Sequence, residues 1–388
     1  MAARRAALSI DRPELDDRSP AFSMAEARHI VCDLFAPNPL IYWADMLVCW
    51  SVAMVSFALV RRFPLFSWQQ IGLFLVSSVL IYRTALFIHE IVHLRTGTFR
   101  VFRFVWNLLC GIPFLVPSFL YYTHLDHHRR AHFGTARDGE YIPLGQQSPW
   151  GIVWYLCQPF FVPGLAIIRF FVLTPLTWID GPIRRWVYRR ASAMVMDPSY
   201  VRPLPTKGML RVWRLQELMV FLFCATVAVF IVRGIVLDPP EEAYHRPVLN
   251  AVLPLGFLVQ AYATGFFICL VNNIRTLGAH RFTNDGRELT FVEQLLDSVN
   301  YPKFSLIAEM WGPVGLRFHA LHHLFPSLPY HNLGRAHQRL MAELPADSPY
   351  RQTNSESLRQ SLKRLWTAAC EARRRRSETT GNEAIVAA

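Results

Sequence analysis

The chain contains 388 residues, 52 % of them hydrophobic, and it carries a formal net charge of +12. The apolar residues lie in long runs, which excludes an ordinary soluble protein and predicts an all-α protein that crosses a membrane several times. Binding of nucleic acid is not supported either, because the arginines flank apolar segments and no recognition motif is present.

Four apolar segments are long enough to cross about 30 Å of hydrocarbon. We expect these membrane spans at residues 41–60, 66–93, 215–232 and 252–274. Two other apolar stretches, 101–122 and 151–179, contain prolines, glycines and arginines. Helix breakers and charges at this density indicate interfacial or re-entrant segments.

The distribution of charge predicts the orientation of the spans. Arginines are frequent between residues 95 and 214 and consecutive at 373–376. The link between the third and fourth spans is acidic and contains Asp238, Glu241 and Glu242. Basic loops stay in the cytoplasm, so we expect both termini there, and in a bacterium the membrane would be the inner membrane. Arg61 and Arg62, between the first two spans, oppose this assignment.

The sequence indicates three regions. We expect a polar cytoplasmic N-terminal segment at 1–39, the membrane domain at 40–340 and a peripheral basic tail at 341–388. Within the tail we expect a short amphipathic helix at 358–369 and a flexible end after Arg376.

Histidines are concentrated in three short clusters and one further position. They are His89 and His93 in HEIVH, His124, His127 and His128 in HLDHH, His319, His322 and His323 in HALHH, and His280 in RTLGAHRF. On a helix, positions i, i+3 and i+4 share one face and can direct imidazoles to a common point. Adjacent histidines such as His127 and His128 diverge enough to reach two metals, and nine imidazoles exceed what one ion can bind. The clusters therefore predict a dinuclear metal site with all its ligands on one side of the membrane.

The remaining histidines are expected to be packed or solvated side chains. They are His29, His132, His245, His331 and His337.

Two other classes of protein can be considered. HEIVH alone matches the HExxH pattern of zinc proteases, in which Glu90 would be the general base. An intramembrane zinc protease needs only one further ligand, which leaves the other clusters without a purpose, and Glu90 can instead orient an imidazole. A metal transporter should place its ligands at mid-membrane depth, whereas these clusters lie at or beyond the ends of spans.

HEIVH, HLDHH and HALHH, in this order and between paired apolar spans, resemble the three histidine boxes of the membrane-bound fatty acid desaturase and hydroxylase superfamily. The resemblance extends over residues 39–339, and HHRRAHFGTARDGEYIPL and ALHHLFPSLPYHNL are most similar to fatty acid and sphingolipid desaturases. It implies four transmembrane helices and a cytoplasmic helical cap in which the clustered histidines bind two iron ions (Fe²⁺). His280 resembles the additional histidine ligand of acyl-CoA desaturases, although Thr276 stands where that family has an asparagine.

The resulting hypothesis is an O2-dependent desaturase that introduces a double bond into a lipid acyl chain. A hydroxylase is the main alternative, because the same diiron centre can transfer oxygen to the chain. No Rossmann glycine motif or HPGG haem motif is present, so the electrons must come from a separate protein. The resemblance implies a ferredoxin or a cytochrome b5 as this partner, beside the lipid substrate and the membrane lipids.

Overall fold

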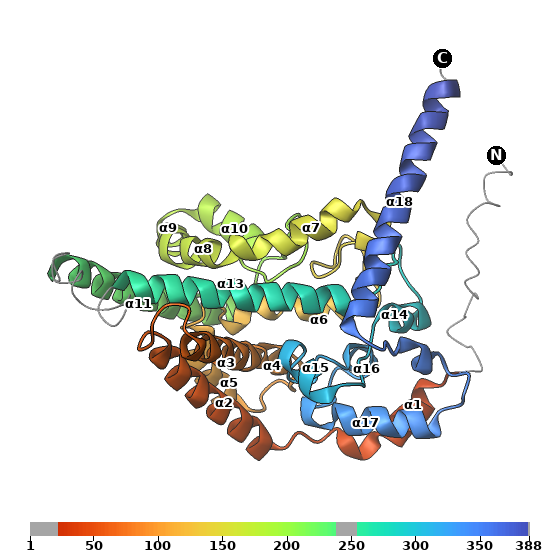
Figure 1. Ribbon diagram of the computed structural model, residues 1–388, viewed down its shortest axis with the longest axis horizontal. Coiled ribbons are helices and arrows are strands. Elements are labelled where there is room, and N and C mark those ends of the chain that lie inside the picture. The colour runs from red at the N-terminus through yellow and green to blue at the C-terminus, as the bar shows by residue number, and fades with distance from the viewer. Residues whose placement is uncertain (1–21, 238–253, 387–388) are drawn as a thin grey trace.

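The computed structural model describes residues 22–237 and 254–386 (Figure 1). In this part of the chain the regular structure is helical, and β-pairing is limited to isolated bridges. The all-α prediction is therefore confirmed. The acidic link with Asp238, Glu241 and Glu242, and His245 within it, lie outside the described residues.

Five segments are long and apolar enough to cross a membrane, judged by length and composition. They comprise α2 (Pro39–Val60), α3 (Trp68–Ala85) with α4 (Phe87–His93), α8 (Val162–Ile167) through α9 (Thr174–Ile179), α11 (Lys207–Leu237) and α13 (Pro254–Ala279). Four of these agree with expected spans. The segment Val162–Ile179 falls in a stretch expected to be interfacial or re-entrant, so a count of four spans is not confirmed.

The additional segment is irregular. A π-helical turn, Ile168–Leu173, separates α8 from α9, and α10 (Gly181–Arg190) folds back against α9. The rings of His127 and His280 lie 5.1 Å apart, so the chain between them must cross the membrane an even number of times. If α11 and α13 both cross the membrane, Val162–Ile179 does not cross it, as expected of an interfacial or re-entrant segment.

Short helices and loops complete the fold. They are α1 (Met24–Ile30), α5 (Arg100–Trp106), α6 (His124–His127), α7 (Pro149–Cys157), α14 (Phe291–Asp297), α15 (Ser305–Trp311), α16 (His319–Leu324) and α17 (Tyr330–Glu343). Figure 1 shows α14, α16, α17 and α1 grouped at one end of the long helices.

Local sequence signals explain several helix boundaries. Asn38 caps α2 by accepting a hydrogen bond from the backbone of Leu40, and Pro39 occupies the first turn. Thr290 and Glu293 form a capping box at the start of α14, the helix that ends at Asp297. Such caps determine where the helices that carry functional side chains begin.

The C-terminal helix α18 (Leu358–Val386) differs from the expectation. It begins where the short helix was expected, but it continues past Arg376 instead of giving way to a flexible end. Its first half packs against α13 and α7, and Leu365 and Ala369 are buried there. Its second half extends away from the rest of the molecule in Figure 1. The division of the chain at 39 and 340 stays a prediction.

Two hydrophobic clusters connect the short helices to the spans. In one, Tyr42 of α2, Phe87 of α4 and Leu321 of α16 pack together. In the other, Phe133 and Tyr141 of the loop after α6 pack with Leu277 of α13. Segments distant in sequence are thereby held against the ends of the long helices.

A polar network joins the first two spans to the cap. Arg83 Nη2 lies 2.6 Å from Asp45 Oδ2, and Arg83 Nη1 lies 3.0 Å from Glu309 Oε2 of α15. The hydroxyl of Tyr330, in α17, donates to Asp45 Oδ2 at 2.9 Å. Charged side chains in membrane spans are tolerated when they are paired inside the bundle, as here.

The Arg83→Ala variant should lose stability, because the carboxylates of Asp45 and Glu309 would be left without their cation. We expect a loss of about 1 to 2 kcal/mol, less than for a fully buried pair, because the side chains of Arg83 and Asp45 are 22 % and 15 % exposed. Thermal unfolding in detergent would measure it. Arg62→Ala, at an exposed site between the same spans, is the control. Equal midpoints for the two variants would contradict the stabilising role of this network.

Candidate metal centre

All nine histidines that were predicted as ligands lie in two adjacent groups. Group one consists of His89, His93, His124, His128 and His322, and group two consists of His127, His280, His319 and His323. Within each group one ring nitrogen per residue lies within 4.8 Å of all the others. The four sequence segments therefore meet in space as two potential metal sites.

The helical spacing explains how the histidines divide between the groups. His124 and His128, four residues apart, both belong to group one, whereas His127 between them belongs to group two. In HALHH the i,i+4 pair belongs to group two and His322 belongs to group one. Each triplet thus contributes to both sites, which agrees with the expectation that the adjacent His127 and His128 diverge toward two metals.

Several histidine ring nitrogens lack hydrogen-bond partners, as expected of atoms that bind a metal ion. Both ring nitrogens of His89 and Nε2 of His93 are buried without a hydrogen-bond partner in the described part of the chain. Nε2 of His128 lies 3.0 Å from Nε2 of His322, and Nε2 of His319 lies 2.9 Å from Nε2 of His280. Buried polar atoms without partners are costly, and ions coordinated by these lone pairs would remove that cost.

The protonation of most of these histidines also suits metal binding. Burial lowers the pKa of His322 and His323 well below the usual value, and neighbouring histidines lower it further. The same two causes act on the pKa of His124 and His319. The rings are therefore neutral at physiological pH, and neutral imidazole is the form that binds metal.

Carboxylate oxygens lie close to Nδ1 of three of the histidine rings. Nδ1 of His124 lies 2.9 Å from Glu140 Oε2, and Nδ1 of His127 lies 2.8 Å from Asp138 Oδ2. Nδ1 of His280 lies 3.3 Å from Asp297 Oδ2. Glu140 and Asp138 can each accept a hydrogen bond from Nδ1–H, so Nε2 of His124 and His127 keeps its lone pair directed toward the centre of its group.

The pKa of Asp138 and the pKa of Glu140 are shifted in opposite directions. Burial acts to raise the pKa of Asp138, but His127 and two backbone N–H groups outweigh it and bring the pKa below the usual value. The same contact raises the pKa of His127 despite the opposing effect of burial. Burial raises the pKa of Glu140 to about 8. Asp138 is therefore the firmly ionised member of the pair.

These three carboxylates were not predicted from the sequence. Asp138 and Glu140 lie in HHRRAHFGTARDGEYIPL, no more than twelve residues after HLDHH. Two acidic residues so close to the cluster could have been predicted to contact its histidines. Asp297 had no such signal, because it reaches His280 only through the isolated bridge between His280 and Ser298.

Glu90 is not positioned as the general base of a zinc protease. It accepts a hydrogen bond from the Tyr42 hydroxyl and another from the Tyr330 backbone N–H. Its Oε1 lies 3.9 Å from Nδ1 of His89. These contacts direct the carboxylate toward α2 and α17, so the structure does not favour the zinc-protease alternative.

Four histidines that were not expected to be ligands are described by the structure, and they lie outside both groups. His337 Nδ1 is 2.8 Å from the Tyr350 hydroxyl, and His331 Nε2 accepts from the Asn38 backbone at 3.1 Å. His29 is exposed, and His132 Nδ1 lies 3.6 Å from Asp126.

Comparisons with known proteins agree with this geometry. A family model described as fatty acid desaturase matches residues 66–354, which include all nine clustered histidines. The chain is similar to a ceramide hydroxylase from Caulobacter vibrioides, with 35 % identity over 338 residues that cover 87 % of this chain and 91 % of the relative. No solved structure matches.

Asp138→Asn should weaken metal binding in group two, because an amide can donate to Nδ1 of His127 and favour the wrong tautomer. Loss of such a supporting carboxylate typically costs about 10- to 100-fold in metal affinity. Titration with a competing chelator, followed by metal analysis, would measure the change. Asp285→Asn, at an exposed position, serves as the control. Wild-type affinity in Asp138→Asn would show that this carboxylate does not orient a ligand.

Proposed function

This chain belongs to the fatty acid desaturase family, and we propose that it is a membrane-bound diiron oxidoreductase that uses O2 to hydroxylate a ceramide-like lipid. The convergence of nine imidazoles into two groups carries the metal assignment. The ceramide hydroxylase relative, similar over most of both chains, supports the substrate class and the hydroxylated product.

The residues have distinct tasks in this proposal. Two iron ions bound by the histidine groups would supply the reduction of O2 and the removal of hydrogen from an aliphatic carbon. Asp138 and Glu140 accept hydrogen bonds from Nδ1–H of His127 and His124, and Asp297 lies close to Nδ1 of His280.

Aromatic rings line the centre and exclude water from it. Tyr121 stacks on His124 with ring centres 4.7 Å apart, and Phe133 lies 5.2 Å from His127 and 5.4 Å from His280. A dry, apolar surrounding protects reactive species and suits an acyl chain.

Desaturation is the second candidate. It was favoured by the sequence around HLDHH and HALHH, and the description of the matching family supports it. The same ligand set serves both reactions, so the histidines do not discriminate between them. We give hydroxylation precedence because the relative named as a hydroxylase matches over 91 % of its length.

Expression in a ceramide-producing host, followed by mass spectrometry of the lipids, should reveal ceramides that have gained one oxygen atom. Loss of two hydrogens instead would identify a desaturase. The purified protein should contain two irons per chain, one for each histidine group. His322→Ala is the matched inactive control. One zinc and no iron would contradict the diiron proposal itself.

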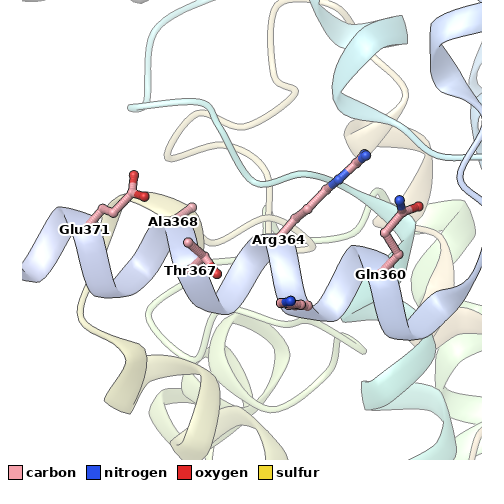
Figure 2. Close-up of a pocket in the computed structure, with 6 residues that line it drawn as sticks. Gln360, Arg364, Thr367, Ala368 and Glu371 are labelled. Carbon is pink, nitrogen blue, oxygen red and sulfur yellow. The ribbon is translucent and has the colours of Figure 1, made fainter.

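We further propose that a separate acidic electron donor, of the ferredoxin or cytochrome b5 type, binds the basic surface of α18. Lys363 and Arg364 line a pocket of about 410 Å³ on this helix, together with Glu371 and uncharged residues. Figure 2 shows Arg364 and Glu371 at this pocket. The base of the helix lies near the centre, because Leu358 packs against Gly278, two residues before His280. The donor would therefore approach on the cap side, which the arginine distribution assigns to the cytoplasm.

Reversing charge in this pocket should slow electron delivery. The double variant Lys363→Glu/Arg364→Glu should lower the donor-dependent rate by roughly 10-fold or more at low salt, with a smaller effect at high salt. The rate with a small-molecule reductant should not change. Arg335→Glu, an exposed arginine on α17, is the control for net charge. An equal loss in both variants would place the donor elsewhere.

A further inference from the structure

Arg275 is a buried cation with no carboxylate partner in the described part of the chain. It lies near the end of α13 and is 8 % exposed. Its Nε and Nη2 donate to Asn272 Oδ1 at 3.3 and 3.2 Å, and Nη2 also donates to Thr276 Oγ1 at 3.1 Å. Within the described residues the guanidinium thus donates only to neutral oxygen atoms.

Two other arginines in the membrane-spanning candidates have carboxylate partners. Arg83 pairs with Asp45, and Arg169 pairs with Glu217. A charged group within a membrane span is expensive and normally acquires a partner, so an exception indicates a functional role. Arg275 is therefore expected to donate to an acceptor that the protein itself does not supply.

Arg275 lies beside the histidine groups. It precedes His280 by five residues, which corresponds to about 7 Å along a helix axis. Its charge acts on both sides of the centre: burial, His323 and His280 lower the pKa of His319, and Arg275 adds to this effect. Burial raises the pKa of Glu140, and His127 and Arg275 oppose it. Glu140 Oε1 is itself buried without a hydrogen-bond partner.

Polar side chains of two other segments surround this position. The Tyr82 hydroxyl of α3 donates to Asn272 Oδ1 at 3.3 Å, and Asn273 Nδ2 donates to the backbone oxygen of Tyr155 in α7 at 2.8 Å. Arg275, Asn272 and Tyr82 therefore form a hydrogen-bonded polar cluster between α3 and α13. A lipid with an internal polar group would match such a cluster.

We propose that Arg275 binds the amide carbonyl oxygen of a ceramide-like substrate, and so selects for oxidation a carbon only a few bonds from that amide. A guanidinium can only donate hydrogen bonds, and among the polar groups of such a lipid the carbonyl oxygen can only accept them. The inference rests on the proposed function for its substrate class. It adds that the polar group, and not the methyl end of the chain, sets the position of reaction.

A chain-length series tests this with the wild-type protein. Ceramides that differ only in acyl length should all be oxidised at the same carbon counted from the amide, as located by tandem mass spectrometry. A position that stays constant when counted from the methyl end would overturn the proposal.

Lipid binding to purified protein provides a test that needs no turnover. Native mass spectrometry should show about 10- to 100-fold weaker ceramide binding to Arg275→Gln, the size expected for a charged hydrogen bond. An analogue in which methylenes replace the whole amide group, so that it carries neither a carbonyl nor a basic nitrogen, should bind wild type and variant equally. Arg281→Gln, whose guanidinium donates to the Gln352 carbonyl on the other side of His280, is the matched control.

The outcomes separate the two proposals. Arg275-dependent binding without any oxidised ceramide would contradict the proposed function and leave the carbonyl site standing. Oxidised ceramide with unchanged binding to Arg275→Gln would contradict the carbonyl site alone. If Arg275→Gln fails to fold or to retain iron, the chain-length series decides the question without it.

Discussion

The fold must bring nine imidazole rings together so that neither imidazole protons nor water occupy the space between their nitrogen atoms. The arrangement of the other segments depends on this requirement. The rings come from α4, α6, α16 and the end of α13, so these segments must lie at the same depth on the same side of the membrane. Carboxylates behind three rings and aromatic side chains around them keep the nitrogen lone pairs directed inward. Burial of the centre then keeps most rings neutral.

The candidate ligands could be predicted from sequence because histidine spacing is a local property. His124 and His128 share a helical face whatever the surrounding fold, and apolar runs mark spans by length alone. The partners of the ligands are not local. Asp297 reaches His280 through a bridge between two loops, and Asp45 finds Arg83 across a helical hairpin. Such contacts depend on tertiary packing that spacing rules do not contain.

The segment Val162–Ile179 illustrates another limit of sequence patterns. Its hydropathy predicts a membrane span, whereas its prolines, its π-helical turn and the buried Arg169 are typical of an interfacial or re-entrant segment. Composition records how apolar a segment is, but not which way the chain leaves it. The contact between His127 and His280 constrains this direction. Both residues must lie on the same side of the membrane, so the chain between them must cross it an even number of times.

The division of each histidine triplet between the two groups has a consequence for assembly. Because α6 and α16 each supply ligands to both sites, neither helix can shift to suit one metal without moving nitrogen atoms of the other. Filling the first site therefore organises most of the second, and emptying either one loosens both. The centre should accordingly load and unload as a single cooperative unit, so that partly metallated protein is scarce at equilibrium.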